Sequence, residues 1–267
     1  MTEYPHDTIV PFSDSDKGKK EQVADMFNKI AFRYDLVNSA LSGGIDRYWR
    51  RKAIRQLARA TPHNILDVAT GTAEMAILTV RTLSQPSKAS GGGVLHTRTG
   101  PWAQITGVDI SEGMLEIGRQ KVARLNLDKQ ITLQTGDSEA LPFPDNQFDA
   151  ITVAFGVRNF GNLEKGLTEM LRVLRPGGRL VVLEFSRPAS PAFRLLYEGY
   201  MRLIASPLGR ILSRNRCAYQ YLRESVQAFP EGQQFLDILV RAGYVETRMK
   251  PLTFGICTIY EGAKILL

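Results

Sequence analysis

Short apolar segments alternate with helical patterns between residues 63 and 185, and this alternation constrains the fold more than any other feature of the sequence. The apolar segments read NILDVA, QITGVDI, QITLQTGD, FDAITVAF and GRLVVLEF. They lack strict polar alternation, as is typical of parallel strands covered on both faces. Helices are predicted between them over residues 74–83, 112–125 and 162–174. The pattern predicts an α/β fold with a doubly wound, mostly parallel sheet.

Two more apolar segments, residues 244–250 and 256–265, end the chain and are joined by the short connection from Pro251 to Gly255. So short a connection favours an antiparallel hairpin at one edge of the sheet, which brings the predicted total to seven strands. Between the sheet and the hairpin, residues 188–241 have a helical pattern.

The N-terminal part predicts two helices, over residues 19–41 and 46–60, separated by Gly43-Gly44. We expect residues 1–18 to be a flexible tail and residues 19–61 to form lid helices over a single domain of residues 62–267. Within that domain, residues 84–104 contain five Gly or Pro between Gly91 and Pro101, which predicts a flexible insertion.

The net charge of +7 is concentrated in two segments of the 267-residue chain. Residues 46–59 hold six basic side chains and one acidic side chain, and residues 187–223 hold seven basic side chains and one acidic side chain. Such segments suit an anionic membrane surface or nucleic acid, and a solvated helix face is the alternative.

Neither a signal peptide nor an apolar stretch of 18 residues is present, which indicates a cytoplasmic protein. Two cysteines indicate a reducing compartment. The three histidines are far apart, and no Cys/His pair has the spacing of metal ligands, so we expect no metal site.

The segment ILDVATGTAE, residues 65–74, has the strand–turn–helix pattern of nucleotide-binding turns, and Asp67 and Gly71 are its candidate ligand-binding residues. In the alternative interpretation, Gly71 only permits the turn.

Asp109 ends the next strand, where an acid can accept both hydroxyl protons of a ribose. It follows Gly71 by 38 residues rather than the usual 20 or so, and the insertion accounts for the excess. Its alternative is a helix N-cap, a role that Ser111 fills equally well.

Two further strand ends carry polar pairs. Asp137 and Ser138 follow the third strand and can bond an adenine amino group and ring; otherwise their polarity only solvates a loop. Arg158 and Asn159 follow the fourth strand, at the edge where open α/β sheets bind ligands. A surface ion pair of Arg158 with Asp145 or Glu164 is the alternative.

These motifs together resemble the class I S-adenosylmethionine-dependent methyltransferases, which have a Rossmann-like fold. The segments SGGIDRYWR, LPFPDNQFDAIT, FGVRNF and LRPGGRLVVLEFSRP are similar to the ubiquinone/menaquinone biosynthesis C-methyltransferases. The resemblance runs from Val23 to the C-terminus, apart from the insertion. It implies methylation of a ring carbon of a polyprenylated quinol, most of all demethylmenaquinol to menaquinol.

The resemblance also implies roles for individual residues. Thr72, Asp109, Asp137 and Ser138 match the positions that bind S-adenosylmethionine in the family. The family's serine at the end of the fourth strand is Ala154 here, and a glycine of its turn is Ala73.

The reaction needs an electron-rich ring carbon, which a quinol gains when a phenolic hydroxyl loses its proton. We expect Arg158 to stabilise that oxyanion or to polarise a water that takes the proton, with Asn159 orienting the substrate. Tyr34 can close over the site and bond the same water, and helix packing with the hydroxyl at the rim is its alternative.

The partner implied is a polyprenylated naphthoquinol at the inner face of a membrane, and the enzyme would contact that surface transiently. Residues 193–216 mix apolar side chains with arginines, as interfacial helices do, although a helix packed on the sheet has the same pattern. A benzoquinol substrate, another lipophilic acceptor and a homodimer are left open. RNA binding and a non-catalytic scaffold are further alternatives, but no aromatic residues are interleaved with the charges, so no nucleic-acid partner is expected.

Overall fold

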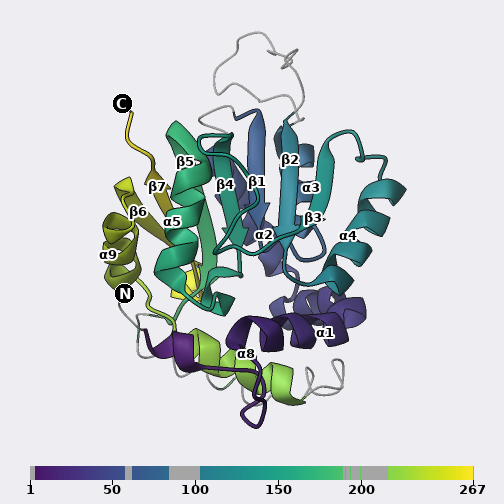
Figure 1. Cartoon of the computed structure of the whole chain (residues 1–267). Helices are drawn as coiled ribbons and strands as arrows, with labels where there is room; N and C mark the ends of the chain where they lie inside the picture. The colour runs from purple at the N-terminus through teal and green to yellow at the C-terminus, as the bar shows by residue number, and fades with distance from the viewer. Residues whose placement is uncertain are drawn as a thin grey trace.

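The computed structural model describes residues 4–57, 62–83, 103–188 and 216–266, with the single positions 190, 193 and 199. Its centre is a seven-stranded sheet in the order β3-β2-β1-β4-β5-β7-β6 (Figure 1). The first five strands in this order pair in parallel, and β7 pairs antiparallel with both β5 and β6. The predicted fold class and the antiparallel C-terminal edge are therefore confirmed.

The strand bounds agree closely with the apolar segments of the sequence. They are β1 Asn64–Val68, β2 Gln104–Asp109, β3 Ile131–Thr135, β4 Phe148–Ala154, β5 Leu174–Phe185, β6 Val245–Leu252 and β7 Cys257–Ala263. The Pro176-Gly177-Gly178 turn lies inside β5, where the pairing with β4 shifts register between Phe148 and Ala150.

The described α-helices are α1 Lys19–Ser42, α2 Ile45–Leu57, α3 Glu74–Leu83, α4 Glu112–Arg124, α5 Leu163–Val173, α8 Arg216–Ala228 and α9 Gln233–Arg241. Three short 3-10 helices join them, namely η1 Pro5–Thr8, η3 Val157–Asn159 and η5 Thr253–Gly255. The helical pattern of residues 189–215 lies largely outside the described residues.

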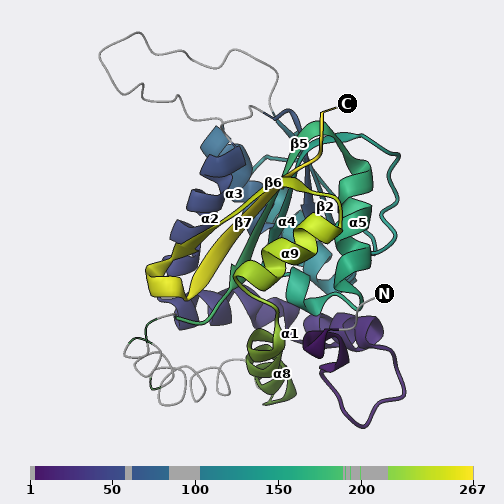
Figure 2. The same ribbon diagram turned by 90° about the vertical axis from the view of Figure 1, so that its left-hand side faces the viewer.

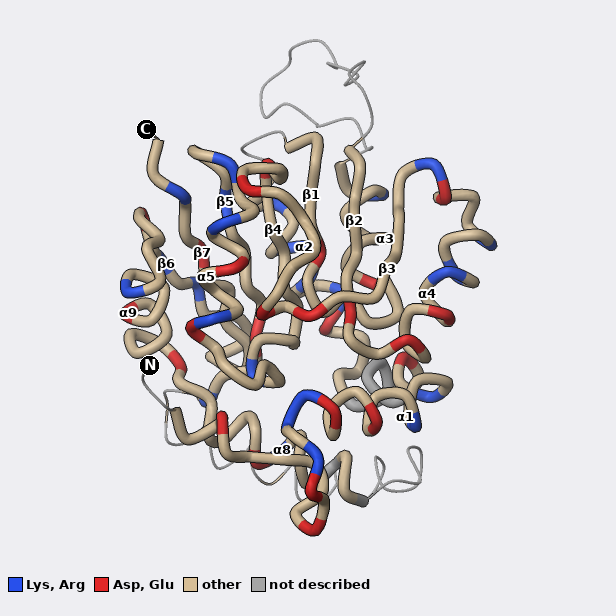
Figure 3. The backbone as a smooth tube through the Cα atoms, in the orientation of Figure 1, with Lys and Arg blue, Asp and Glu red and all other residues tan. Residues whose placement is uncertain are grey.

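Each face of the sheet is covered by its own set of helices, as Figures 1 and 2 show. One apolar core joins the sheet to α2, α3 and α4, and a second joins it to α5 and α9. In β1, β2 and β4 the acids lie at or beside the strand ends, and the other positions of these three strands carry no charge (Figure 3). A small third cluster joins Val23 and Met26 of α1 to Ala218 and Tyr221 of α8. These two helices lie across the carboxyl ends of the parallel strands (Figure 1).

Two predicted boundaries differ in the structure. Gln104, placed in the predicted insertion over residues 84–104, begins β2 and lies opposite Asn64, because a polar residue at a strand end resembles a loop in the sequence. Residues 84–102 lie outside the described residues. Part of the tail predicted over residues 1–18 is packed: His6 is fully buried in η1, against the ring of Phe229.

Asp149 joins the amino ends of β4 and β1. Its carboxylate accepts hydrogen bonds from the backbone N–H groups of His63, at 2.6 Å, and Asn64, at 3.0 Å. We expect Asp149→Ala to lower the free energy of unfolding by about 2 kcal/mol, because two backbone N–H groups lose a charged acceptor and Arg175 loses its ion pair at 2.8 Å. The measurement is urea denaturation. The control is Glu246→Ala, which removes an exposed ion pair with Arg179 and should cost less than about 0.5 kcal/mol. Equal losses would contradict the assignment.

Candidate functional site

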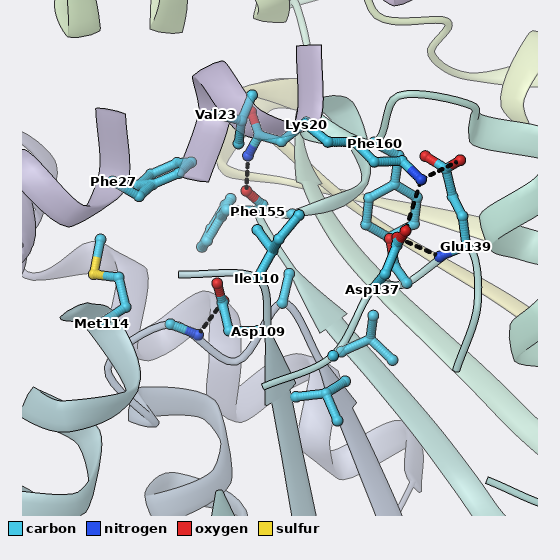
Figure 4. Close-up of a pocket in the computed structure, with 18 of the residues that line it drawn as sticks. Lys20, Val23, Phe27, Asp109, Ile110, Met114, Asp137, Glu139, Phe155 and Phe160 are labelled. Atoms are coloured by element: carbon cyan, nitrogen blue, oxygen red, sulfur yellow. Dashed lines mark hydrogen bonds and ion pairs between the residues drawn. The ribbon is translucent and has the colours of Figure 1, made fainter. Parts of the chain in front are cut away.

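A pocket lies at the carboxyl edge of the parallel strands, beneath α1 (Figure 4). Its walls come from the residues that follow β1, β2, β3 and β4, and α1 closes it from outside. The lining includes Lys20, Val23, Phe27, Tyr34, Ala69, Gly71, Asp109, Asp137, Ser138, Ala154, Phe155, Asn159 and Phe160. Residues predicted from four separate motifs therefore meet in one cavity.

The turn after β1 and the end of β2 are joined by a direct hydrogen bond. Gly71 has φ +56°, a conformation that favours glycine, and its N–H donates to Oδ2 of Asp109 at 2.8 Å. The N–H of Ser111 donates to the other oxygen of Asp109 at 2.9 Å, while the Ser111 hydroxyl caps α4. Asp109 is thus not the N-cap. Burial raises its pKa to about 6, although these N–H groups favour the ionised form.

Asp137 and Ser138 line the far end of the pocket, next to β3. Lys20 of α1 reaches down to Asp137 at 2.7 Å and to Glu139 at 2.8 Å (Figure 4). Burial opposes ionisation of Asp137, but its hydrogen bonds from Lys20 and the Glu139 N–H bring its pKa below the ordinary value. A ligand at this end would meet an ionised Asp137 with both oxygens engaged.

Asp67 and Thr72 lie behind the pocket wall. Asp67 is buried and accepts hydrogen bonds from the hydroxyls of Thr70 and Thr152, both at 2.6 Å. Thr72 donates its hydroxyl proton to Asp35 of α1 at 2.6 Å and accepts a hydrogen bond from Lys121. The side chain of Thr72 therefore joins the turn to the covering helix.

Backbone strain is concentrated at this edge. Ala69, Ala73 and Phe155 have φ of +53°, +64° and +60°, in the left-handed region that side-chain-bearing residues rarely adopt. Each such residue costs about 1–3 kcal/mol, and clusters of them are typical of functional sites. Ala73, which stands where the family's turn tends to have glycine, thus adopts a conformation that favours glycine.

Arg158 lies deep beside the pocket, only 4% exposed. Its guanidinium donates to the Phe155 carbonyl at 2.7 Å and to Oε1 of Glu184 at 2.6 Å. The alternative of a surface ion pair between Arg158 and Asp145 or Glu164 is wrong, since Asp145 pairs with Arg172 and Glu164 pairs with Arg241. Asp145 is exposed before β4 and Glu164 is partly exposed on α5, whereas Arg158 turns inward from η3.

Glu184 is the residue at this site that sequence reasoning missed. It is fully buried at the end of β5, and burial raises its pKa although the charge of Arg158 opposes that rise. An acid inside the apolar segment GRLVVLEF is itself a signal, because a buried carboxylate needs a charged or hydrogen-bonding partner.

Asn159 and Tyr34 face the pocket from opposite sides. Asn159 lines it from η3, and its Oδ1 is buried with no hydrogen-bond partner among the described residues. Tyr34 lines it from α1 and packs edge-on against the ring of Phe27. The predicted catalytic residues therefore border one space, with Arg158 behind Asn159 and Phe155.

The helix α1 is attached on both sides of the pocket by polar contacts. On one side stands Lys20, and on the other Lys121 of α4 pairs with Asp35 at 2.5 Å and with Glu74 at 2.7 Å. Between them, Oδ1 of Asn28 accepts hydrogen bonds from the Ser111 hydroxyl and the Gly113 N–H. These contacts hold α1 over the pocket, and its action as a lid stays a prediction.

Comparison with known proteins identifies the fold and the family. The model of the ubiE/COQ5 methyltransferase family matches residues 15–264. The chain belongs to this family. Its curated relatives include demethylmenaquinone methyltransferase from Bacteroides fragilis, 44% identical over 98% of this chain and 99% of the relative. The ubiquinone/menaquinone biosynthesis C-methyltransferase UbiE of Geobacter sulfurreducens is 42% identical over 92% and 90%.

Solved structures agree with the fold of this ubiE/COQ5 family member. Human N-acetylserotonin methyltransferase in complex with SAM has a TM-score of 0.59 at 17% identity, covering 93% of this chain and 60% of that one. A SAM-dependent methyltransferase from Thermotoga maritima has a TM-score of 0.58 at 17% identity, covering 90% and 99%. The chain is a methyltransferase that uses S-adenosylmethionine. In the described part of the chain, no three His, Cys, Asp or Glu side chains gather as metal ligands.

The ordinary pKa of an aspartate is near 3.8, and that of Asp109 is raised to about 6. An ionised Asp109 accepts ribose hydroxyl protons and a protonated one does not, so the donor binds the ionised form. We expect the dissociation constant for S-adenosylmethionine to rise about tenfold per pH unit below pH 6 and to level above it. Calorimetric titration between pH 5 and 8 measures this. Asp109→Asn should bind weakly at every pH, and a pH-dependent Asp109→Asn would exclude Asp109 as the titrating group.

Proposed function

We propose that this enzyme methylates a ring carbon of demethylmenaquinol, giving menaquinol. Proteins named demethylmenaquinone methyltransferase in Bacteroides fragilis, Porphyromonas gingivalis and Deinococcus radiodurans are 43–44% identical to it over 93–98% of its length. The observation that carries the proposal is a buried arginine beside an apolar pocket at the end of β4. An apolar ring suits the aromatic wall of Phe27, Phe155 and Phe160, and a phenolate suits the nearby guanidinium.

S-adenosylmethionine, when bound, supplies an electrophilic methyl group on a sulfonium. The protein must then provide an electron-rich ring carbon in line with that methyl group. Arg158 serves this need because its Nε is buried beside the pocket and has no hydrogen-bond partner among the described residues, so a quinol oxygen that reaches it would supply the missing partner. A positive charge there lowers the pKa of the phenolic hydroxyl and stabilises the phenolate.

Asn159 and Tyr34 bind and orient the quinol, which is the methyl acceptor. The unpartnered Oδ1 of Asn159 accepts the proton of a quinol hydroxyl or of a water and so fixes the ring's orientation. Tyr34 closes the pocket from α1 and bonds the water that takes the phenolic proton. None of the described residues that line the pocket is a histidine, so water polarised by Arg158 is the proton acceptor in the proposal. Water takes the phenolic proton first, and it takes the ring proton of the methylated carbon after the methyl group has left the sulfonium and bonded to that carbon.

The test is transfer of a labelled methyl group from S-adenosylmethionine to reduced demethylmenaquinone, with a polyprenylated benzoquinol as a second acceptor. We expect transfer to the naphthoquinol, and we expect Arg158→Ala to lower the rate at least about 100-fold while donor affinity changes less than about threefold. Arg248→Ala, an exposed arginine on the edge strand β6, should retain full activity. Donor binding without transfer to the naphthoquinol would refute the proposed substrate. Equal loss of rate and donor affinity in Arg158→Ala would assign that residue to binding or folding.

We also propose that the enzyme works against an anionic membrane surface, where a polyprenylated quinol resides. No described helix is long and apolar enough to span a bilayer. Large apolar side chains are exposed near the pocket, with Phe32 at 91% and Leu36 at 62% on α1, one helical turn apart. The exposed arginines of α2, namely Arg47, Arg51 and Arg55, share one face of that helix. Exposed apolar side chains on α1 and exposed arginines on α2 both support binding to anionic lipid.

Vesicle sedimentation tests this surface. Phe32→Ser combined with Leu36→Ser should lower binding to phosphatidylglycerol vesicles at least about tenfold and slow methylation of a vesicle-borne quinol. A water-soluble, short-chain quinol should be methylated at the original rate. Val240→Ser, which changes an exposed apolar residue on α9, is the control and should bind vesicles normally. Unchanged sedimentation of the double variant would place the membrane contact elsewhere.

A further inference from the structure

Arg50 is a buried cation with no strong partner. It lies on the inner side of α2, is 8% exposed, and has its nearest recorded carboxylate, Asp46, at 3.7 Å. Its Nε is buried without a hydrogen-bond partner among the described residues. Because an isolated buried charge is costly, a guanidinium in this state indicates an anionic ligand that completes its contacts.

The guanidinium of Arg50 lies against the wall of the donor pocket. Its central carbon is 5.1 Å from the centre of the Phe155 ring, and Phe155 lines the pocket. Burial raises the pKa of Asp67, and the positive charge of Arg50 partly opposes this, as expected for neighbouring groups. Arg50 therefore stands over the ends of β1 and β4.

The sheet order gives the direction in which the donor lies. Asp137 and Ser138 follow β3, Asp109 ends β2, Gly71 follows β1 and Phe155 follows β4, and these strands are neighbours in that order. With the ribose at Asp109 and the adenine toward Asp137, the rest of the donor must extend over β1 and β4. That portion ends in the amino acid group of methionine, with one carboxylate and one ammonium.

Other cations around the pocket are already paired at short distance. Lys20 contacts Asp137 and Glu139, Lys121 contacts Asp35 and Glu74, and Arg158 contacts Glu184, each within 2.8 Å. We infer that Arg50 binds the α-carboxylate of S-adenosylmethionine. The neighbouring carboxylate of Asp67 gives this end of the site the opposite charge needed near the donor's ammonium group. The inference concerns the donor alone and does not depend on which quinol is methylated.

The experiment compares two donors that differ only in the carboxylate. Calorimetry measures binding of S-adenosylmethionine and of decarboxylated S-adenosylmethionine to the full chain, without any quinol. We expect Arg50→Gln to weaken binding of S-adenosylmethionine about 10- to 100-fold, the range for a lost hydrogen bond to a charged group, and to leave the decarboxylated donor within about twofold. Arg50→Lys should retain part of the difference between the donors, because it keeps the charge.

Arg47→Gln and Arg51→Gln are the matched controls, since both arginines are exposed on the same helix, and both should bind each donor normally. Unchanged affinity of Arg50→Gln for S-adenosylmethionine would overturn the inference. An equal loss for both donors would also overturn it, by assigning Arg50 to the shape of the pocket. Should Arg50→Gln fail to fold by circular dichroism, Arg50→Lys decides alone, because a carboxylate ligand requires the two donors to lose affinity unequally. Failure of quinol methylation would leave these binding results intact, so the two proposals are tested separately.

Discussion

Burial of both faces of the parallel sheet is the constraint on which the rest of this structure depends. With helices packed on each side, the middle of β1 and β4 is buried, and charged groups in β1, β2 and β4 are confined to the strand ends. All five parallel strands end at the same edge, so the residues after them converge there although they are far apart in the sequence. The pocket is a consequence of this packing, because that edge gathers polar groups that are anchored by the ends of four neighbouring strands.

The cover over the site is held in a different way from the sheet. The contacts of α1 with the catalytic edge are largely ion pairs and side-chain hydrogen bonds, through Lys20, Lys121 and Asn28. Partly exposed pairs of this kind contribute little individually and weaken with salt, whereas the sheet rests on buried apolar area. A stable sheet and a weakly attached α1 suit a site that must admit a methyl donor and an apolar ring and then release two products.

Most of the fold could be read from the sequence, because hydrophobic periodicity and the turn residues agreed at nearly every element. The parallel strands, their helices and the antiparallel hairpin followed from local pattern alone. So did the position of Asp109, Asp137 and Asn159, since a residue after a parallel strand has a known edge of the sheet. Local pattern could not show which partner each charge takes. Glu184 beside Arg158 and Lys121 beside Asp35 are contacts between elements distant in sequence, and Arg50 looked like one of six similar basic residues until its burial separated it from Arg47 and Arg51.

The place where α3 leads into β2 has a consequence for how such enzymes vary. The helix α3 ends at Leu83, and β2 begins at Gln104. Both points lie at the amino ends of the strands, across the full length of the sheet from the pocket (Figure 1). Length can therefore be gained or lost between α3 and β2 during evolution without displacing the described residues that line the pocket. The same position is a suitable place to attach a fluorophore or a fused domain when the enzyme is studied at work.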